Sequence, residues 1–243
     1  MSSSSNILLH LKDLCIGYTK GKPVLQNIEV QLQSGTLTGL IANNGTGKST
    51  LLKTLAGSLS PLSGKIELNN KDLVSFSHNE LSKKIAIVLT EKPSLGGFSV
   101  WDLVAMGRFP YTNMFGQLTT NDVSIIDQSM ERCGIISLKE KNCNELSDGE
   151  FQKAMIARAL AQQTDVLLLD EPTAFLDYSS KRNLFVLLKD IAQKENKIIL
   201  TSSHDIETLL KYANSALILQ KNKAAKLYLV EELKGKEFET LLE

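Results

Sequence analysis

The sequence predicts an α/β fold in which a mostly parallel sheet carries an inserted helical region. Apolar runs with the composition of buried strands recur along the chain, and each one ends in a polar loop. Stretches of helical spacing separate these runs, as expected for parallel strands, which need crossover connections. The segment 91–163 shows helical spacing and no convincing strand, which predicts a helical insertion. The apolar runs are residues 38–41, 166–169, 198–201 and 216–219.

The remaining elements are predicted in chain order. Residues 8–33 alternate apolar and polar side chains around the turn Gly21-Lys22-Pro23, which predicts antiparallel strands before the parallel core. Another strand is predicted at 85–89, and helices at 49–55, 100–106, 122–133 and 151–161. We predict one domain over 1–243, with an α/β core and antiparallel β subdomain at 6–91 and 162–243 and a helical subdomain at 92–161.

Charge and composition exclude several classes of protein. The 27 Lys and Arg balance 27 Asp and Glu, so the net charge is zero and no nucleic-acid partner is expected. No apolar run approaches the roughly 20 residues that cross a bilayer, and the N-terminal run is too short for a signal peptide. The three cysteines lack metal-ligand spacing, which fits a reducing compartment. These features predict a cytoplasmic protein.

A glycine-rich loop joins the strand at 38–41 to the helix at 49–55. Its glycines let backbone amides turn toward one anion, and the helix N-terminus adds unpaired N–H groups. Lys48 can reach the β- and γ-phosphates of a nucleotide, and Ser49 is a better candidate than Thr50 for ligating Mg²⁺. Ala42 replaces the first glycine of the phosphate-loop pattern, so it takes either an allowed conformation or a strained one. A turn that only caps the helix is the plainer alternative. The candidate nucleotide-binding residues are Asn43, Asn44, Gly45, Thr46, Gly47, Lys48, Ser49 and Thr50.

Two carboxylates follow the strand at 166–169, at the edge where open α/β sheets bind ligands. Asp170 is a candidate Mg²⁺ ligand, and Glu171 is a candidate for polarising an attacking water. His204, just beyond another strand, can hydrogen-bond a transferred phosphate. The plainer alternatives are that acidic residues end strands in solvent and that a lone histidine is structural.

The segment 146–152 precedes an Ala-rich helix. Ser147 is a natural N-cap with Glu150 three residues later, and a capping box explains both residues structurally. The alternative is that this helix start is a second anion site. Because it lies far along the chain from the glycine-rich loop, one chain need not use both on the same nucleotide.

The order of these motifs resembles the nucleotide-binding subunit of an ABC transporter over nearly the whole chain. The glycine-rich loop resembles its P-loop, and 166–171 resembles its Walker B strand. Tyr18 is similar to the aromatic residue that stacks on adenine, 175–177 to the D-loop and His204 to the switch histidine. The segment 146–152 resembles the LSGGQ signature, with Asp148 and Glu150 replacing a glycine and the glutamine. The resemblance implies a P-loop NTPase of ABC-cassette fold, with a RecA-like core, an antiparallel β subdomain and an inserted helical subdomain.

The resemblance also implies an ATPase that uses ATP and Mg²⁺ and works as an ATP-dependent homodimer. Each ATP would lie between the P-loop of one copy and the signature helix of the other. Ser147, Gly149, Glu150 and Asp177 would then bind nucleotide across the interface, with Ser147 and Gly149 donating to the γ-phosphate. The implied catalytic residues are Lys48, Ser147, Gly149, Glu171 and His204.

The sequence departs from the family pattern after the strand at 85–89. Where the family has the Q-loop glutamine, this chain has Thr90, Glu91, Lys92 and Pro93 in succession. We expect the Thr90 hydroxyl to replace the glutamine as a Mg²⁺ ligand, unless Glu91 supplies that ligand or water fills the position.

Residues 99–111 are similar to the segment after the Q-loop in importers of iron–siderophore, haem and cobalamin complexes. This implies an ATPase that powers uptake of a metal chelate through a separate integral membrane permease, with a substrate-binding protein in the same system. The subunit would lie peripherally at the cytoplasmic face of the inner membrane. Two other classes stay open: a soluble ABC-type clamp in translation, DNA repair or iron–sulfur assembly, and a nucleotide-binding regulator without turnover. We expect about half of the candidate docking residues to pack inside the helical region instead. Alanine at Arg108 or Tyr111 is expected to weaken association with the permease. The candidate docking residues are Val100, Trp101, Phe109 and Tyr111.

Overall fold

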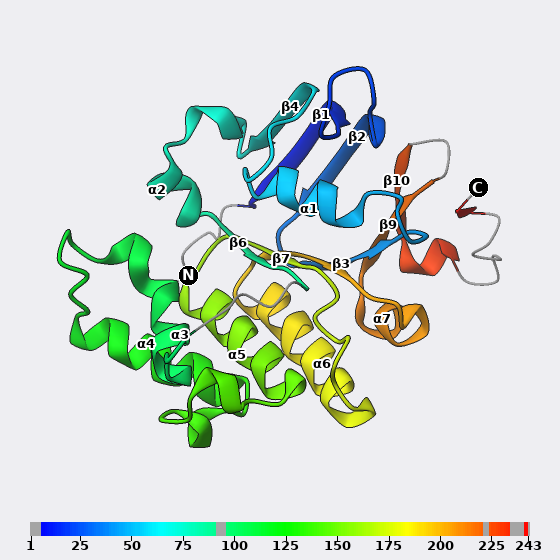
Figure 1. Ribbon diagram of the computed structural model, residues 1–243. Helices are drawn as coiled ribbons and strands as arrows, with labels where there is room; N and C mark the ends of the chain where they lie inside the picture. Colours follow the sequence, from blue (N-terminus) through cyan, green and yellow to red (C-terminus); the bar gives the residue numbers. More distant parts are fainter. Residues whose placement is uncertain (1–5, 91–95, 221–223, 234–240, 243) are drawn as a thin grey trace.

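The computed structural model describes residues 6–90, 96–220, 224–233 and 241–242, which form two sheets and the helices around them (Figure 1). The first sheet is antiparallel, with strand order β2-β1-β4-β5. Alternating residues of β2 are buried, as the alternating sequence predicts. Its strands are β1 (Leu8–Ile16), β2 (Leu25–Gln33), β4 (Ser63–Leu68) and β5 (Lys71–Asp72).

Within the described residues the second sheet has the strand order β10-β9-β3-β8-β7-β6. It is parallel from β9 to β6, and β10 pairs antiparallel with β9 at the edge. The central strands are buried along their whole length, which explains their continuous apolar runs. The strands are β3 (Thr36–Ile41), β6 (Ile85–Val88), β7 (Val166–Leu169), β8 (Ile198–Ser202), β9 (Ser215–Leu219) and β10 (Ala225–Leu229).

Helices cover both faces of the parallel sheet (Figure 1). On one face α1 (Lys48–Leu55) places Leu51, Leu52 and Leu55 in a core shared with both sheets. On the other face α5 (Asp148–Ala161), α6 (Tyr178–Lys194) and α7 (Ile206–Tyr212) pack into a second core. No described helix is both long and apolar enough to cross a membrane.

The helical region lies at one end of the molecule, where α3 (Val100–Ala105) and α4 (Thr120–Arg132) pack against α5 (Figure 1). The predicted helices at 100–106, 122–133 and 151–161 are confirmed, with α5 beginning slightly earlier. The predicted subdomain boundary at 91/92 lies outside the described residues. The region contains α3 (Val100–Ala105), η2 (Met106–Tyr111), α4 (Thr120–Arg132), η3 (Ile136–Leu138) and η4 (Cys143–Glu145), and the short elements elsewhere are η1 (Leu73–Ser75), α2 (His78–Ser82) and η5 (Val230–Leu233).

Strand register brings the polar ends of four strands together. Val88 of β6 lies opposite Leu169 of β7, and Leu169 lies opposite Thr201 of β8. Leu40 of β3 lies opposite Ser202. The residues that follow these strands therefore meet at one carboxyl edge, beside the N-terminus of α1.

Candidate functional site

The loop between β3 and α1 has the backbone of an anion cradle. Gly45 and Gly47 adopt φ angles of 76° and 110°, in the left-handed region that favours glycine. A Cβ on Gly47 would lie only 2.4 Å from Cγ1 of Val24, so the loop also needs glycine for space. Ala42 is not among the residues with positive φ, and it therefore takes the allowed conformation. The missing first glycine of the pattern does not strain the loop.

The start of α1 is free to receive an anion. Gly47 is its N-cap and supplies no side-chain hydrogen bond, and the first turn holds no acidic residue. Lys48 lies at the same point, where its Nζ donates to the carbonyl oxygen of Ala42 at 3.1 Å. These groups place a positive helix end and a cation at the mouth of the loop.

Asp170 is the centre of a hydroxyl network below that loop. Its Oδ2 accepts from Ser49 Oγ at 2.6 Å, and its Oδ1 accepts from Ser202 Oγ at 2.8 Å. Ser202 also accepts from the backbone N–H of Glu171 at 2.8 Å. The sequence predicts Ser49 and Asp170 separately as candidate Mg²⁺ ligands, and the structure brings their side chains together. The sequence predicts no role for Ser202. The available signal was the position of Ser202 at the end of β8, next to β7.

Glu171 and His204 form a pair at the same edge. Glu171 Oε1 lies 2.8 Å from Nε2 of His204, and the histidine side chain is 60% exposed. Glu171 has a φ of 51°, which is unfavourable for a residue with a side chain. The hydrogen bond from its amide to Ser202 holds that conformation. The strained backbone conformation of Glu171 sets the direction of its carboxylate. Strained backbone of this kind is typical of functional positions.

Thr90 lies beside this network but faces its backbone. Its hydroxyl donates to the carbonyl oxygen of Asp170 at 3.0 Å. The hydroxyl oxygen keeps lone pairs, so a Mg²⁺-ligand role for Thr90 stays a prediction. Glu91, the alternative ligand, lies outside the described residues.

The donor set fits magnesium better than a metal held by protein alone. The described residues contain no group of three His, Cys, Asp or Glu side chains that could hold a metal ion. One carboxylate and one hydroxyl, from Asp170 and Ser49, meet instead at the phosphate loop. Mg²⁺ is usually bound in this way, through few protein oxygens together with water and substrate phosphates.

Tyr18 completes a cavity of about 410 Å³ at this edge, which we call the phosphate-loop cavity. The ring is 66% exposed, and its hydroxyl accepts from Thr50 Oγ1 at 3.3 Å. An exposed ring anchored by one end can stack on a planar ligand. In the same loop, the N–H of Thr46 bonds the carbonyl oxygen of Asn43. The cavity is lined by Tyr18, Val24, Asn44, Gly45, Gly47, Lys48, Ser49, Thr50 and Glu171.

A second cavity of about 420 Å³ lies at the start of α5, and we call it the signature cavity. Ser147 caps α5 in a capping box with Glu150, so the structural explanation of these two residues is confirmed. Asp177, on the other wall of the cavity, caps α6. Hydrogen bonds, above all from the Ser179 hydroxyl, hold the pKa of the Asp177 carboxyl far below its usual range. The two cavities share no lining residue. The signature cavity is lined by Ser147, Asp148, Gly149, Glu150, Lys153, Phe175, Leu176, Asp177 and Ser180.

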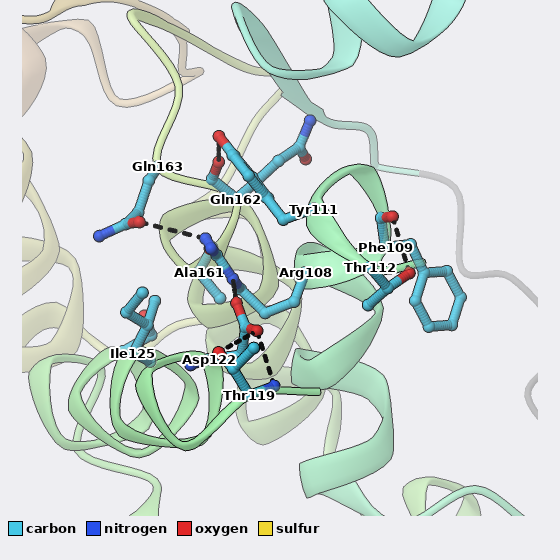
Figure 2. Close-up of polar contacts among 11 residues, drawn as sticks. Arg108, Phe109, Tyr111, Thr112, Thr119, Asp122, Ile125, Ala161, Gln162 and Gln163 are labelled. Atoms are coloured by element: carbon cyan, nitrogen blue, oxygen red, sulfur yellow. Dashed lines mark hydrogen bonds and ion pairs between the residues drawn. The ribbon is translucent and has the colours of Figure 1, made fainter. Parts of the chain in front are cut away.

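The candidate docking residues separate into buried and exposed ones. Val100 is fully buried, and Arg108 is buried in an ion pair with Asp122, so neither can meet a partner directly. Val100 packs in the core, as expected for about half of the candidates. The expectation that alanine at Arg108 removes a docking contact is corrected, because Arg108 is buried inside the helical region (Figure 2). Phe109 and Tyr111 remain exposed, by 59% and 38%.

Trp101 is half-buried rather than free. Its indole N–H donates to Oδ1 of Asp127 at 3.2 Å, and its ring packs against the core of the helical region. It therefore offers a partner only part of its surface.

The chain is similar to known proteins over most of its length. A family model described as ABC transporter matches residues 25–174. An uncharacterized ABC transporter ATP-binding protein of Methanocaldococcus jannaschii is 43% identical over 89% of this chain and 74% of its own length. The achromobactin transport ATP-binding protein of Dickeya dadantii is 36% identical over 84% of this chain and 75% of its own. A solved structure described as a metal-chelate type ABC transporter in an inward-facing conformation matches with a TM-score of 0.82 and 29% identity, over 97% of this chain and 88% of that one.

Proposed function

The chain belongs to the ABC transporter family as an ATP-binding subunit, and from this premise we propose that it hydrolyses ATP to drive import of a metal chelate. The observation that carries the proposal is the network at the phosphate-loop cavity. Ser49, Asp170 and Ser202 are joined by hydrogen bonds of 2.6 and 2.8 Å, and Ser202 bonds the amide of Glu171, which pairs with His204. This is the arrangement that phosphoryl transfer to water requires.

The residues of that network have separate tasks. Lys48 and the amides of the loop hold the triphosphate, and Tyr18 stacks on the adenine. Ser49 and Asp170 hold Mg²⁺, which when bound neutralises part of the phosphate charge. Glu171 accepts the proton of the attacking water, and His204 donates a hydrogen bond to the phosphate being transferred. Thr90 is the candidate for the position of the missing Q-loop glutamine.

The working form in this proposal is an ATP-dependent homodimer. The P-loop and the signature segment line two cavities with no residue in common. In the proposed homodimer a single nucleotide binds between the phosphate-loop cavity of one copy and the signature cavity of the other. Ser147 and Gly149 of the second copy stabilise charge on the γ-phosphate, and Glu150 and Asp177 lie beside them in the same cavity.

The importer assignment draws on two similarities. One relative transports achromobactin, and the similar solved structure is of metal-chelate type. In this assignment an integral membrane permease docks on the helical region, where Phe109 and Tyr111 are exposed, and a substrate-binding protein delivers the chelate. The subunit then lies at the cytoplasmic face of the inner membrane as a peripheral protein.

The variant Glu171→Gln tests the enzymatic part. It removes the proton acceptor and keeps the shape, so we expect hydrolysis to fall by about 100-fold or more while ATP binding persists. The trapped ATP should hold the protein as a stable dimer, which light scattering after size exclusion detects. Glu207→Gln, in an exposed pair with Lys211, is the matched control and should leave both properties unchanged.

Unchanged hydrolysis in Glu171→Gln would contradict the role proposed for Glu171. A parent protein without hydrolysis, whose cellular function is unchanged by Glu171→Gln, would instead be a nucleotide-binding regulator without turnover. Co-purification with a membrane permease expressed from a neighbouring reading frame tests the importer part. A protein that ignores the permease and binds nucleic acid in a salt-sensitive way would belong to the class of soluble clamps.

A further inference from the structure

The signature cavity is lined by three carboxylates, of Asp148, Glu150 and Asp177, and one lysine, Lys153, so negative charge dominates where a triphosphate would have to fit. Asp148 and Glu150 both lie in the first turn of α5, beside Ser147 and Gly149. In the proposed homodimer the ATP held by one copy brings its phosphates to this turn of the other. Carboxylates there repel a polyanion unless a cation offsets them.

Glu150 carries a full charge in this position. Its Oε2 accepts from the amide of Ser147 at 2.8 Å and from the Ser147 hydroxyl at 3.0 Å. These two hydrogen bonds, helped by Lys141, lower the pKa of the Glu150 carboxyl below its ordinary value. The carboxylate is therefore ionised at neutral pH, and its negative charge faces the signature cavity unless a neighbouring cation offsets it.

Lys141 is that neighbour. Its Nζ lies 3.4 Å from the same Oε2 of Glu150. The backbone of Lys141 is fixed on both sides: its amide donates to the carbonyl of Leu138, and its carbonyl accepts from the amide of Val100 at the start of α3. Its position is thus set by the helical region and does not depend on the ion pair alone.

We propose that Lys141 is a positioning residue for the shared nucleotide site: it neutralises Glu150, so that Ser147 and Gly149 can approach the ATP bound by the partner copy. The inference rests on the proposed function, because it presupposes the ATP-dependent homodimer. Lys141 does not touch the nucleotide itself. Lys141 sets the electrostatic potential of the protein surface that closes over the nucleotide.

A surface ion pair without function is the competing explanation, and the same region supplies a matched example. Lys139 pairs with Asp127 at 3.1 Å, with side chains 35% and 34% exposed. In the pair of Lys141 with Glu150 the side chains are 34% and 32% exposed. The two pairs differ in the carboxylate, because Glu150 lines the signature cavity and Asp127 does not; neither lysine lines it. Loss of either lysine should therefore cost similar stability, but only loss of Lys141 should weaken the dimer.

The experiment uses the full chain carrying Glu171→Gln, so that hydrolysis does not disturb the equilibrium. ATP is titrated in the presence of Mg²⁺, and the dimer fraction is measured by sedimentation. Lys141→Gln should raise the ATP concentration at half-dimerisation by about fivefold, the scale of an exposed charge interaction. Lys141→Arg and Lys139→Gln should leave it unchanged, and adding Glu150→Gln to Lys141→Gln should restore it.

Two further readouts separate the outcomes. ATP binding to the dilute monomer should be equal in all variants, because the P-loop is untouched. If Lys141→Gln fails to fold, Glu150→Gln alone decides: removal of the carboxylate should lower the ATP requirement. The inference would be overturned if Lys141→Gln and Lys139→Gln reached half-dimerisation at the same ATP concentration. It would also be overturned if Glu150→Gln did not restore dimerisation of Lys141→Gln. A parent protein that binds ATP and never dimerises would contradict the proposed function itself, and the inference would fall with it.

Discussion

Ser202 connects two residues that have different chemical tasks. It is fully buried, its hydroxyl donates to Asp170 at 2.8 Å, and its oxygen accepts from the amide of Glu171 at 2.8 Å. One small side chain therefore orients the proposed metal ligand and supports the left-handed backbone of the proposed base. Loss of such a support matters because catalytic groups have to be placed within a fraction of an ångström.

We predict that Ser202→Ala lowers kcat for ATP hydrolysis by about 10-fold and stability by roughly 1–2 kcal/mol, because two buried polar groups lose a partner. Steady-state kinetics and urea unfolding measure the two effects. Ser203→Ala is the control, since that hydroxyl is buried against Thr173 and touches neither Asp170 nor Glu171. It should cost comparable stability and little activity. Equal kcat values for both variants would contradict the role given to Ser202.

At the scale of elements, η2, α4 and α5 are joined by one buried cation. Arg108 Nε donates to Oδ1 of Asp122 at 2.8 Å, and its Nη1 donates to the carbonyl oxygen of Ala161 at 2.7 Å (Figure 2). Asp122 also closes the capping box of α4 with Thr119. The contact is tight, because a Cβ on Gly107 would lie 2.2 Å from the carbonyl oxygen of Arg158.

We predict that Asp122→Asn lowers the free energy of unfolding by about 3 kcal/mol at pH 7, because it leaves a buried guanidinium without its counter-charge. Hydrogen bonds from Thr119, together with Arg108, lower the pKa of Asp122 from its ordinary value of 3.8. The stabilisation is therefore complete above that value and is lost as the pH falls through the lower folded-state pKa. The difference in the free energy of unfolding between Asp122→Asn and the parent protein should disappear in that acidic range.

Urea unfolding across pH measures this difference. Asp190→Asn, in an exposed pair with Lys194, is the control and should cost less than about 1 kcal/mol at any pH. If Asp122→Asn lowers the free energy of unfolding as little as the control does, the buried pair of Arg108 and Asp122 contributes little to stability.

Part of this arrangement could be predicted from the sequence. The P-loop, the carboxylates after the strand at 166–169 and the capping box of Ser147 with Glu150 are local patterns, and each fixes its own geometry. The burial of Arg108 and the link through Ser202 depend on which elements pack together, and no local spacing encodes that. The strand β10 was not predicted because its residues alternate weakly and its pairing with β9 is decided by the sheet edge.

At the scale of the whole molecule, the two proposed interfaces lie on different parts of the chain. The nucleotide cavities are at the sheet edge and the start of α5, whereas Phe109 is exposed on η2 of the helical region. Docking to a permease should thus be separable from ATP binding by mutation.

We predict that Phe109→Ala weakens association with the permease by about 10-fold, because an exposed aromatic side chain at an interface is a frequent hot spot. ATP affinity should be unchanged. Leu229→Ala is the control, since Leu229 is exposed to a similar extent, 58%, on β10 at the far side of the parallel sheet. Co-purification and nucleotide titration measure the two properties. Loss of ATP binding in Phe109→Ala, or equal retention of the permease by both variants, would contradict the docking role.

The anchoring of α5 has a mechanical consequence. Its last turn is held by Arg108 and by the Tyr111 hydroxyl, which donates to the carbonyl oxygen of Gln162, while its first turn forms a wall of the signature cavity. The helix has 14 residues and contains no proline, so it is a rod of about 21 Å. An intact helix neither stretches nor folds. If η2 moves and carries the last turn of α5 with it, the helix moves as a rigid body. Ser147 and Gly149 at its start then move as well, without a relay of separate side chains.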